Sequence, residues 1–193
     1  SKMRKITLIE LVALCQAAQG KLEKIYLHWT AGHYENLCAD YHLNITGKGE
    51  LYLSTEALTT VLAHTWRRNT GAIGLALCCC FDATIQVDGE FDLGSEPPTQ
   101  LQLEVAAQVL ALLTRELKIP LDADHVLTHA EIADFDGYGP AVRGTADFEK
   151  WDLWQLWDYD GQWHFGGDVL RGKAAWYSEH GQQKLPEKIL PKK

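Results

Sequence analysis

The sequence predicts an α/β fold made of a single domain, in which a central mixed β-sheet is flanked by helices. Strand-like apolar segments alternate along the chain with amphipathic helical patterns, which is the order expected of such a domain. A hydrophobic fraction of 46% and a charged fraction of 23% are typical of a globular protein. With 193 residues, the chain is long enough to bury one sizeable core and short enough for one domain.

The N-terminal segment, residues 6–18, is predicted to be a helix. Thr7 and Glu10 have the spacing of a capping box. An apolar stripe at helical intervals follows, formed by Leu8, Leu11, Val12 and Cys15. Basic residues precede this stretch, as in a signal peptide, but Glu10 and Gln16 interrupt the apolar region that a signal peptide requires. We therefore expect no signal peptide and synthesis in the cytoplasm.

Four short segments with strand character come next. Gly47 and Gly49 lie between two of them and can supply the turn of a β-hairpin. The last of the four is apolar enough to lie at the centre of the sheet. The predicted strands are residues 24–28, 41–45, 50–53 and 72–81.

The cysteines favour a reducing compartment. Cys15, Cys38, Cys78, Cys79 and Cys80 form neither an even disulfide framework nor a CxxC pair. The last three are adjacent and continue an apolar strand, where consecutive side chains point to opposite faces and cannot converge on one ion. We expect them to be buried in the strand and not to form a metal cluster.

The second half of the chain begins with the clearest helix. Thr99 and Gln102 form a capping box, and an apolar stripe continues until Pro120 stops the helix. A short extended segment, residues 125–128, then ends at His129. Residues 131–147 are predicted to be a long loop and residues 148–157 an aromatic helix. We assign residues 1–177 to the domain and the polar residues 178–193 to a loosely held C-terminal tail.

Two histidines are candidates for metal binding. His28 and His129 each follow a short apolar strand, at the point where a strand opens into a loop. A neutral imidazole is the commonest protein ligand of a metal ion. The same position also suits a histidine that only makes structural hydrogen bonds, so the pattern alone leaves both roles open.

Several motifs in order resemble the zinc-dependent N-acetylmuramoyl-L-alanine amidases, a superfamily that includes the peptidoglycan recognition proteins and the phage amidase lysozymes. The resemblance covers about residues 22–157. It rests on Ile-Tyr-Leu-His-Trp-Thr-Ala-Gly at residues 25–32, Tyr41-His42, His64, Asn-Thr-Gly-Ala-Ile-Gly at residues 69–74, the capped helix, and Val-Leu-Thr-His at residues 126–129.

The resemblance implies a catalytic zinc site with one ion per chain. Its ligands would be His28, His129 and Asp152, the last because family members carry an Asp or Cys two residues after a lysine, here Lys150. Tyr41 and Lys150 would be the catalytic residues that stabilise the oxyanion. The substrate would be peptidoglycan or a muropeptide, cut at the amide between N-acetylmuramic acid and L-alanine of the stem peptide. His64 and Trp29 are assigned to substrate binding.

The chain departs from the family pattern at three places. Many cytoplasmic members carry a glutamate in the strand where this chain has Ala76, so the glutamate-assisted variant is not expected. Leu153, and not a proline, follows the third ligand, and the gap from the second histidine is longer than usual. Asp134 and Asp136 in the intervening segment are therefore alternatives to Asp152.

Other conspicuous side chains have two interpretations each. Trp151, Trp154 and Trp157 could stack on sugar rings, but a tryptophan row at this spacing more often packs on the core. Arg67 and Arg68 could bind carboxylates of the stem peptide, but a solvated pair of charges is the more common role.

Partners and competing functions follow from the same residues. The formal charge of −8 disfavours nucleic acid, no apolar run is long enough for a transmembrane segment, and protein partners are not indicated. A non-catalytic recognition module of the same fold is the main alternative. A cysteine hydrolase that pairs Cys38 with His129 is a weaker one, because no nucleophile turn surrounds this cysteine. Without a signal peptide, the enzyme would act on the wall after lysis or delivery, as a phage or prophage endolysin or an injected effector.

Overall fold

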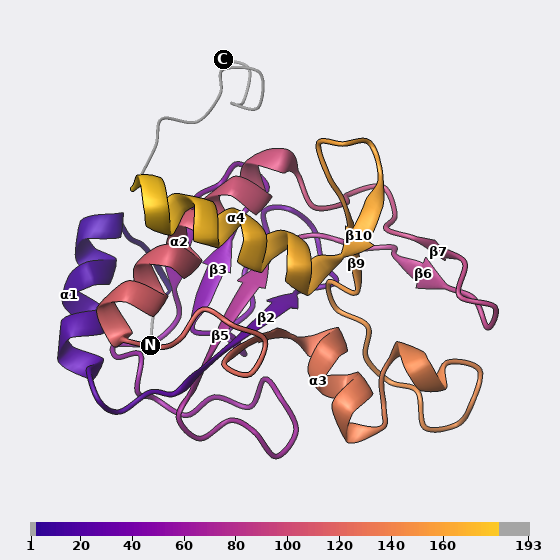
Figure 1. Ribbon diagram of the computed structural model, residues 1–193, viewed down its shortest axis with the longest axis horizontal. Helices are drawn as coiled ribbons and strands as arrows, with labels where there is room; N and C mark the ends of the chain where they lie inside the picture. Colours follow the sequence, from indigo (N-terminus) through magenta and orange to yellow (C-terminus); the bar gives the residue numbers. More distant parts are fainter. Residues whose placement is uncertain (1–2, 182–193) are drawn as a thin grey trace.

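The computed structural model describes residues 3–181 and contains one central sheet with helices on both faces (Figure 1). The six strands of this sheet are arranged in the order β1-β4-β3-β5-β2-β8. Their bounds are Arg4–Lys5 (β1), Lys24–Trp29 (β2), Leu43–Ile45 (β3), Leu51–Leu53 (β4), Ala72–Leu77 (β5) and Val126–Thr128 (β8). Strand β2 pairs in parallel with β5 and β8, whereas β4 pairs antiparallel with β1 and β3. The predicted mixed sheet is confirmed.

Three helices form one layer over this sheet. They are α1 (Leu8–Ala18), α2 (Gln100–Leu117) and α4 (Gly166–His180), and α2 packs between the other two. Both predicted capping boxes are present, with Thr7 and Thr99 as the N-caps. Helix α4 was not predicted, and the proposed boundary between the domain and the tail falls inside it. Residues 182–193 of the proposed tail lie outside the described residues. None of the described helices is long and apolar enough to cross a membrane.

The opposite face of the sheet is covered by α3 (His129–Asp136), which is followed by a short 3-10 helix, Pro140–Val142. Along β2, Ile25 and Leu27 belong to the main core beneath the three-helix layer. The alternate residue Tyr26 packs with Ile132 of α3 in a separate small cluster. Because side chains alternate along a strand, His28 points to the same face as Tyr26, toward α3.

The structure corrects three of the predicted elements. The segment 131–147 was predicted to be a loop, but its start belongs to α3, which is short and gave no strong periodic signal. The segment 148–157 was predicted to be an aromatic helix, but it forms turns and then β9 (Gln155–Trp157), which pairs with β10 (Trp163–Phe165). The strand predicted over 72–81 ends at Leu77. A second small hairpin joins β6 (Thr84–Ile85) to β7 (Phe91–Asp92).

Candidate metal centre

His28 is held rigidly on an interior strand. It lies one residue before the end of β2, pairs in register with Ala76 of β5, and is completely buried. Its neighbour on the other side is β8, whose last residue, Thr128, pairs with Leu27. Parallel strands end at the same edge of a sheet, so the residue that follows β8 is brought next to His28. That residue is His129.

His129 is the first residue of α3, and its position is fixed by the helix cap. The side chain of Thr128 accepts a hydrogen bond from the Glu131 backbone N–H, and the Glu131 carboxylate accepts one from the Thr128 N–H. Arg171 of α4 donates to both oxygens of Glu131 at 2.8 and 2.9 Å. A Cβ on Gly167 would overlap the Glu131 carboxylate, which would then have to move from its place against α4.

Asp152 reaches the two histidines from the loop before β9. Its backbone carbonyl accepts a hydrogen bond from the Ala130 N–H at 3.2 Å, which ties the loop to the start of α3. The next residue, Leu153, has a φ of 59°, in the left-handed region that is costly for a side chain larger than glycine. A Cβ on Gly166 would clash with the Leu153 carbonyl oxygen. The start of α4 therefore packs tightly against the loop that carries Asp152.

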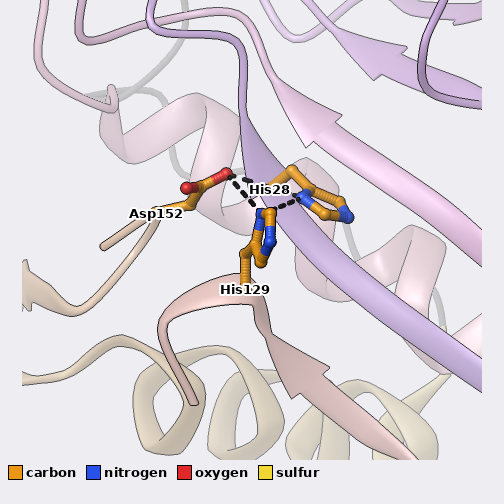
Figure 2. Close-up of side chains that lie close together, drawn as sticks. All are labelled: His28, His129 and Asp152. Atoms are coloured by element: carbon orange, nitrogen blue, oxygen red, sulfur yellow. Dashed lines mark hydrogen bonds and ion pairs between the residues drawn. The ribbon is translucent and has the colours of Figure 1, made fainter. Parts of the chain in front are cut away.

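Three potential ligand atoms converge between these elements (Figure 2). The Nδ1 atoms of His28 and His129 are 3.1 Å apart, and Oδ2 of Asp152 lies 3.3 Å from His129 Nδ1 and 3.5 Å from His28 Nδ1. All three residues are buried, with at most 5% of any of them exposed. The set could hold a metal ion.

The chemistry of this set fits a zinc ion. Two imidazole nitrogens and one carboxylate oxygen are a common catalytic set of zinc ligands, leaving a fourth position open. Burial lowers the pKa of His28 to about 4, so its ring is neutral at pH 7 and has a lone pair for a metal. Burial alone would raise the pKa of the Asp152 carboxyl, but hydrogen bonds from His129 and His28 outweigh it and lower the pKa. A shared proton can bridge only one pair of the three atoms, whereas a metal cation can accept a lone pair from each of them.

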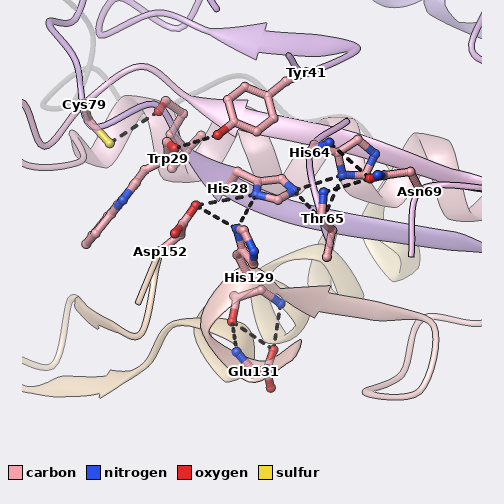
Figure 3. Close-up of polar contacts among 12 residues, drawn as sticks. His28, Trp29, Tyr41, His64, Thr65, Asn69, Cys79, His129, Glu131 and Asp152 are labelled. Carbon is pink, nitrogen blue, oxygen red and sulfur yellow. Dashed lines mark hydrogen bonds and ion pairs between the residues drawn. The ribbon is translucent and has the colours of Figure 1, made fainter. Parts of the chain in front are cut away.

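The outer nitrogens of both histidines have partners as well, and Figure 3 shows those of His28. His28 Nε2 lies 3.3 Å from Thr65 Oγ1 and 3.3 Å from His64 Nδ1. His129 Nε2 lies 3.3 Å from the Tyr138 hydroxyl. When the outer nitrogen of a histidine donates a hydrogen bond, its inner nitrogen keeps the lone pair that a metal needs. These contacts therefore orient both rings toward the shared centre.

The predicted catalytic residue Tyr41 lies beside this centre. Its ring centroid is 4.7 Å from that of His28, and its hydroxyl donates to the Trp29 carbonyl at 3.4 Å. Burial raises the pKa of the Tyr41 hydroxyl, so it stays protonated and can donate a hydrogen bond. The predicted partner Lys150 is exposed on the loop before Asp152. Its positive charge, like burial, disfavours protonation of His28 and lowers the pKa of that ring.

The two residues assigned to substrate binding are both buried. His64 is 6% exposed and contacts His28, while Trp29 is 6% exposed and packs edge to face on Trp151 at a centroid distance of 4.6 Å. His64 therefore makes a polar contact next to the centre, and Trp29 packs beside it. Asn69 supports His64 because its side-chain oxygen accepts hydrogen bonds from the backbone N–H groups of His64 and Thr65.

The alternatives to Asp152 make other contacts. Asp136 accepts two hydrogen bonds from Arg68 at 2.7 Å each. Asp134 accepts one from the backbone N–H of Ala141 at 2.8 Å. Arg68 is thus occupied by an ion pair, while the guanidinium of Arg67 lies over the Trp66 ring. Of the three carboxylates considered, Asp152 is the one that the structure brings to the histidines.

The cysteine alternative gains no support. Burial raises the pKa of the Cys38 thiol, which is the opposite of what a nucleophilic cysteine requires. All five cysteines are free thiols, and Cys78, Cys79 and Cys80 are buried as expected, although they follow the end of β5 and do not lie within the strand.

Two residues at the centre escaped the sequence analysis. Thr65 and Tyr138 contact the outer nitrogens of the two histidines, but a single threonine after His64 and a tyrosine between two glycines carry no spacing signal. The motif at residues 69–74 is the one sequence feature that relates to the position of His64 and Thr65. Its asparagine holds the turn of residues 64–65, and a Cβ on its last residue, Gly74, would lie 2.9 Å from the His64 ring.

Solved structures of other proteins share the fold of this chain. Among solved structures, the fold is similar to an endolysin N-acetylmuramoyl-L-alanine amidase, LysCS, from Clostridium intestinale URNW, with 17% identity over 56% of this chain and 69% of that chain and a TM-score of 0.41. It is also similar to the Drosophila peptidoglycan recognition protein SD, with 15% identity, 68% and 86% coverage and a TM-score of 0.44. No curated protein sequence matches the chain significantly.

A family model described as N-acetylmuramoyl-L-alanine amidase matches residues 18–145. The matched region contains His28, Tyr41 and His129, while Asp152 and the β9–β10 hairpin lie beyond its end. Since the match covers more than half of the 193 residues, this chain belongs to the N-acetylmuramoyl-L-alanine amidase family.

Proposed function

We propose that the protein is a zinc-dependent peptidoglycan hydrolase that cleaves the amide between N-acetylmuramic acid and L-alanine of the stem peptide. The observation that carries this proposal is the convergence of His28, His129 and Asp152 in a buried centre of a chain that belongs to an amidase family. A recognition module that only binds needs no such set of ligand atoms. We also propose that the protein reaches the cell wall after lysis or delivery, either as an endolysin or as an injected effector.

Each residue has a separate task in this reaction. His28, His129 and Asp152 would hold one zinc ion, which when bound supplies a Lewis acid that makes water nucleophilic near neutral pH. The protonated hydroxyl of Tyr41 would donate a hydrogen bond to the substrate carbonyl oxygen as negative charge develops on it. Lys150 would bring its ammonium group to the same oxygen from the exposed loop. Electrostatic stabilisation of this kind is usually the largest single contribution to catalysis.

Digestion of purified sacculi, analysed by mass spectrometry, tests the proposal. The zinc-loaded protein should release stem peptides with a free L-alanine amino terminus and create no new reducing sugar ends. A chelator should abolish the activity and added zinc should restore it. New reducing ends without free L-alanine would identify a glycosidase, and retention of wall fragments without any release of peptide would identify a recognition module.

A further inference from the structure

The β9–β10 hairpin and the start of α4 line an open pocket that contains none of the residues of the metal centre. Its volume is about 580 Å³. Its walls include Trp163 and Phe165 of β10, Asp158 and Asp160 of the connecting turn, and Asp168 of α4. All of these residues lie beyond residue 145, where the family match ends. The pocket is therefore a feature of this chain that the family match does not explain.

Large aromatic rings are exposed in and beside this pocket. Trp163 is 44% exposed, Phe165 59% and the cross-strand neighbour Trp157 47%. The Trp157 and Trp163 rings meet edge to face with centroids 5.3 Å apart, and Trp163 also packs on Phe91 at 4.8 Å. Rings that are exposed to water do not contribute the favourable free energy of burial. A group of exposed rings is therefore typical of a binding site. Because neighbours already hold Trp163 in place, little side-chain entropy would be lost on binding.

The carboxylates of the pocket have basic or histidine neighbours, but Arg171 also pairs with Glu131 and Lys173 also lies 3.9 Å from Glu104, so the pocket is acidic on balance. Asp158 pairs with Lys173 at 3.1 Å and Asp168 with Arg171 at 3.0 Å. Asp160 accepts a hydrogen bond from the exposed His164 at 2.6 Å. A cationic ligand would have to compete with Lys173 and Arg171, and an anion would be repelled by the carboxylates. The pocket thus offers hydrogen-bond acceptors beside aromatic surface and disfavours anions, which suits an uncharged ligand rich in hydroxyl groups.

We propose that this pocket is a carbohydrate-binding subsite for neutral pyranose sugars. The apolar C–H face of a sugar ring would pack on Trp163 and Phe165, while Asp158 and Asp160 would accept hydrogen bonds from its hydroxyl groups. That the sugar is part of a peptidoglycan strand rests on the proposed function. The subsite would then hold the glycan while the metal centre acts on the peptide branch.

A row of aromatic contacts joins the subsite to the metal centre. Trp163 packs on Phe91, Phe91 on Trp151 at a centroid distance of 6.3 Å, and Trp151 on Trp29. Trp29 directly follows His28 in the chain, and Trp151 directly precedes Asp152. A glycan bound at the hairpin would therefore lie at one end of a row of packed rings whose other end adjoins the proposed zinc ligands.

Calorimetric titration with a tetramer of N-acetylglucosamine tests the subsite directly. This probe is neutral, carries no stem peptide and has no bond that the proposed amidase could cut. The protein should bind it, and Trp163→Ala and Phe165→Ala should each weaken binding at least tenfold. The second variant, Phe165→Ala, keeps the test valid if Trp163→Ala prevents the hairpin from folding. Trp176→Ala is the matched control, because Trp176 is 47% exposed but lies on α4 outside the pocket, and it should bind like the unchanged protein.

The outcomes separate the subsite from the proposed function. Asp152→Ala should bind the tetramer normally while losing cleavage. Binding of the tetramer without any amidase activity would overturn the proposed function and leave the subsite intact. Cleavage of sacculi without binding of the tetramer, unchanged binding in both pocket variants, or binding of choline in place of the tetramer would each overturn the subsite.

Discussion

The Nδ1 atoms of His28 and His129 face each other across 3.1 Å, although 101 positions separate the two residues in the chain. The pairing of β8 with β2 produces this contact, because the two parallel strands end at the same edge of the sheet. Two nitrogens at this distance cannot both carry a hydrogen toward one another. Together with Oδ2 of Asp152, they form a set of ligand atoms that a cation completes.

Asp152→Ala should therefore lose zinc. Removing the carboxylate takes away both a ligand and the negative charge that balances the ion, so metal content and metal-linked stability should fall together. Asp134→Ala and Asp136→Ala are matched controls, because these carboxylates bond to Ala141 and Arg68, and both variants should keep about one zinc per chain. Metal analysis of the three purified variants decides the matter. Full zinc in Asp152→Ala would remove Asp152 from the ligand set.

Tyr41→Phe and Lys150→Ala should lower turnover while leaving metal content unchanged. Neither side chain belongs to the three converging ligands, and loss of one oxyanion donor typically costs about two to three orders of magnitude in kcat. The Michaelis constant for soluble muropeptides should change much less. If both variants kept the turnover of the unchanged protein, other residues would have to stabilise the oxyanion.

The sequence patterns predicted five of the six strands of the sheet, although not β1 (Arg4–Lys5) or the strand order. The position of His28 and His129 after apolar strands made them candidates for metal binding, but only the family resemblance assigned them as ligands. Asp152 could be predicted only from the resemblance, since 23 positions separate it from His129 and no periodic pattern spans that stretch. Its rivals Asp136 and Asp134 make contacts with Arg68 and Ala141 that no spacing rule reveals.

Tertiary contacts decided the elements that the sequence analysis missed. Helix α3 has eight residues, too few for a clear apolar period, and it is fixed by its cap and by Arg171 of α4. The aromatic segment 148–157 has helical spacing of its tryptophans. However, the backbone at Leu153 adopts a left-handed conformation, and β9 pairs with β10 instead. A local sequence pattern contains no information about such partners, because the partner residues lie elsewhere in the chain.

The ion pair between Arg68 and Asp136 should contribute stability that depends on pH. The hydrogen bond from Arg68 lowers the pKa of the Asp136 carboxyl below its ordinary value. The pair therefore stabilises the folded state above about pH 4, the pKa of an unfolded aspartate, and the contribution disappears as the pH falls through the lower folded value.

Asp136→Asn should accordingly reduce the free energy of unfolding at pH 7 by about 1 kcal/mol, with a smaller difference at pH 3. Urea denaturation at both values measures the effect. Arg67→Ala provides the control, because the guanidinium of Arg67 lies over Trp66 and forms no ion pair with Asp136 among the described residues. A difference that is the same at both pH values would show that packing, and not charge, accounts for the effect.

Gly167→Ala should weaken zinc binding from a position that touches no proposed ligand. The new Cβ would clash with the Glu131 carboxylate, which caps α3 and binds Arg171, so the start of α3 that carries His129 would shift. Loss of such outer support typically costs about 10- to 100-fold in metal affinity. Gly172→Ala, in the same helix with nothing within 4 Å of its Cβ, should keep full affinity and gain stability, because alanine favours a helix more than glycine does. Competition with a chelator measures both affinities, and equal values for the two variants would mean that the contact between Gly167 and Glu131 does not position His129.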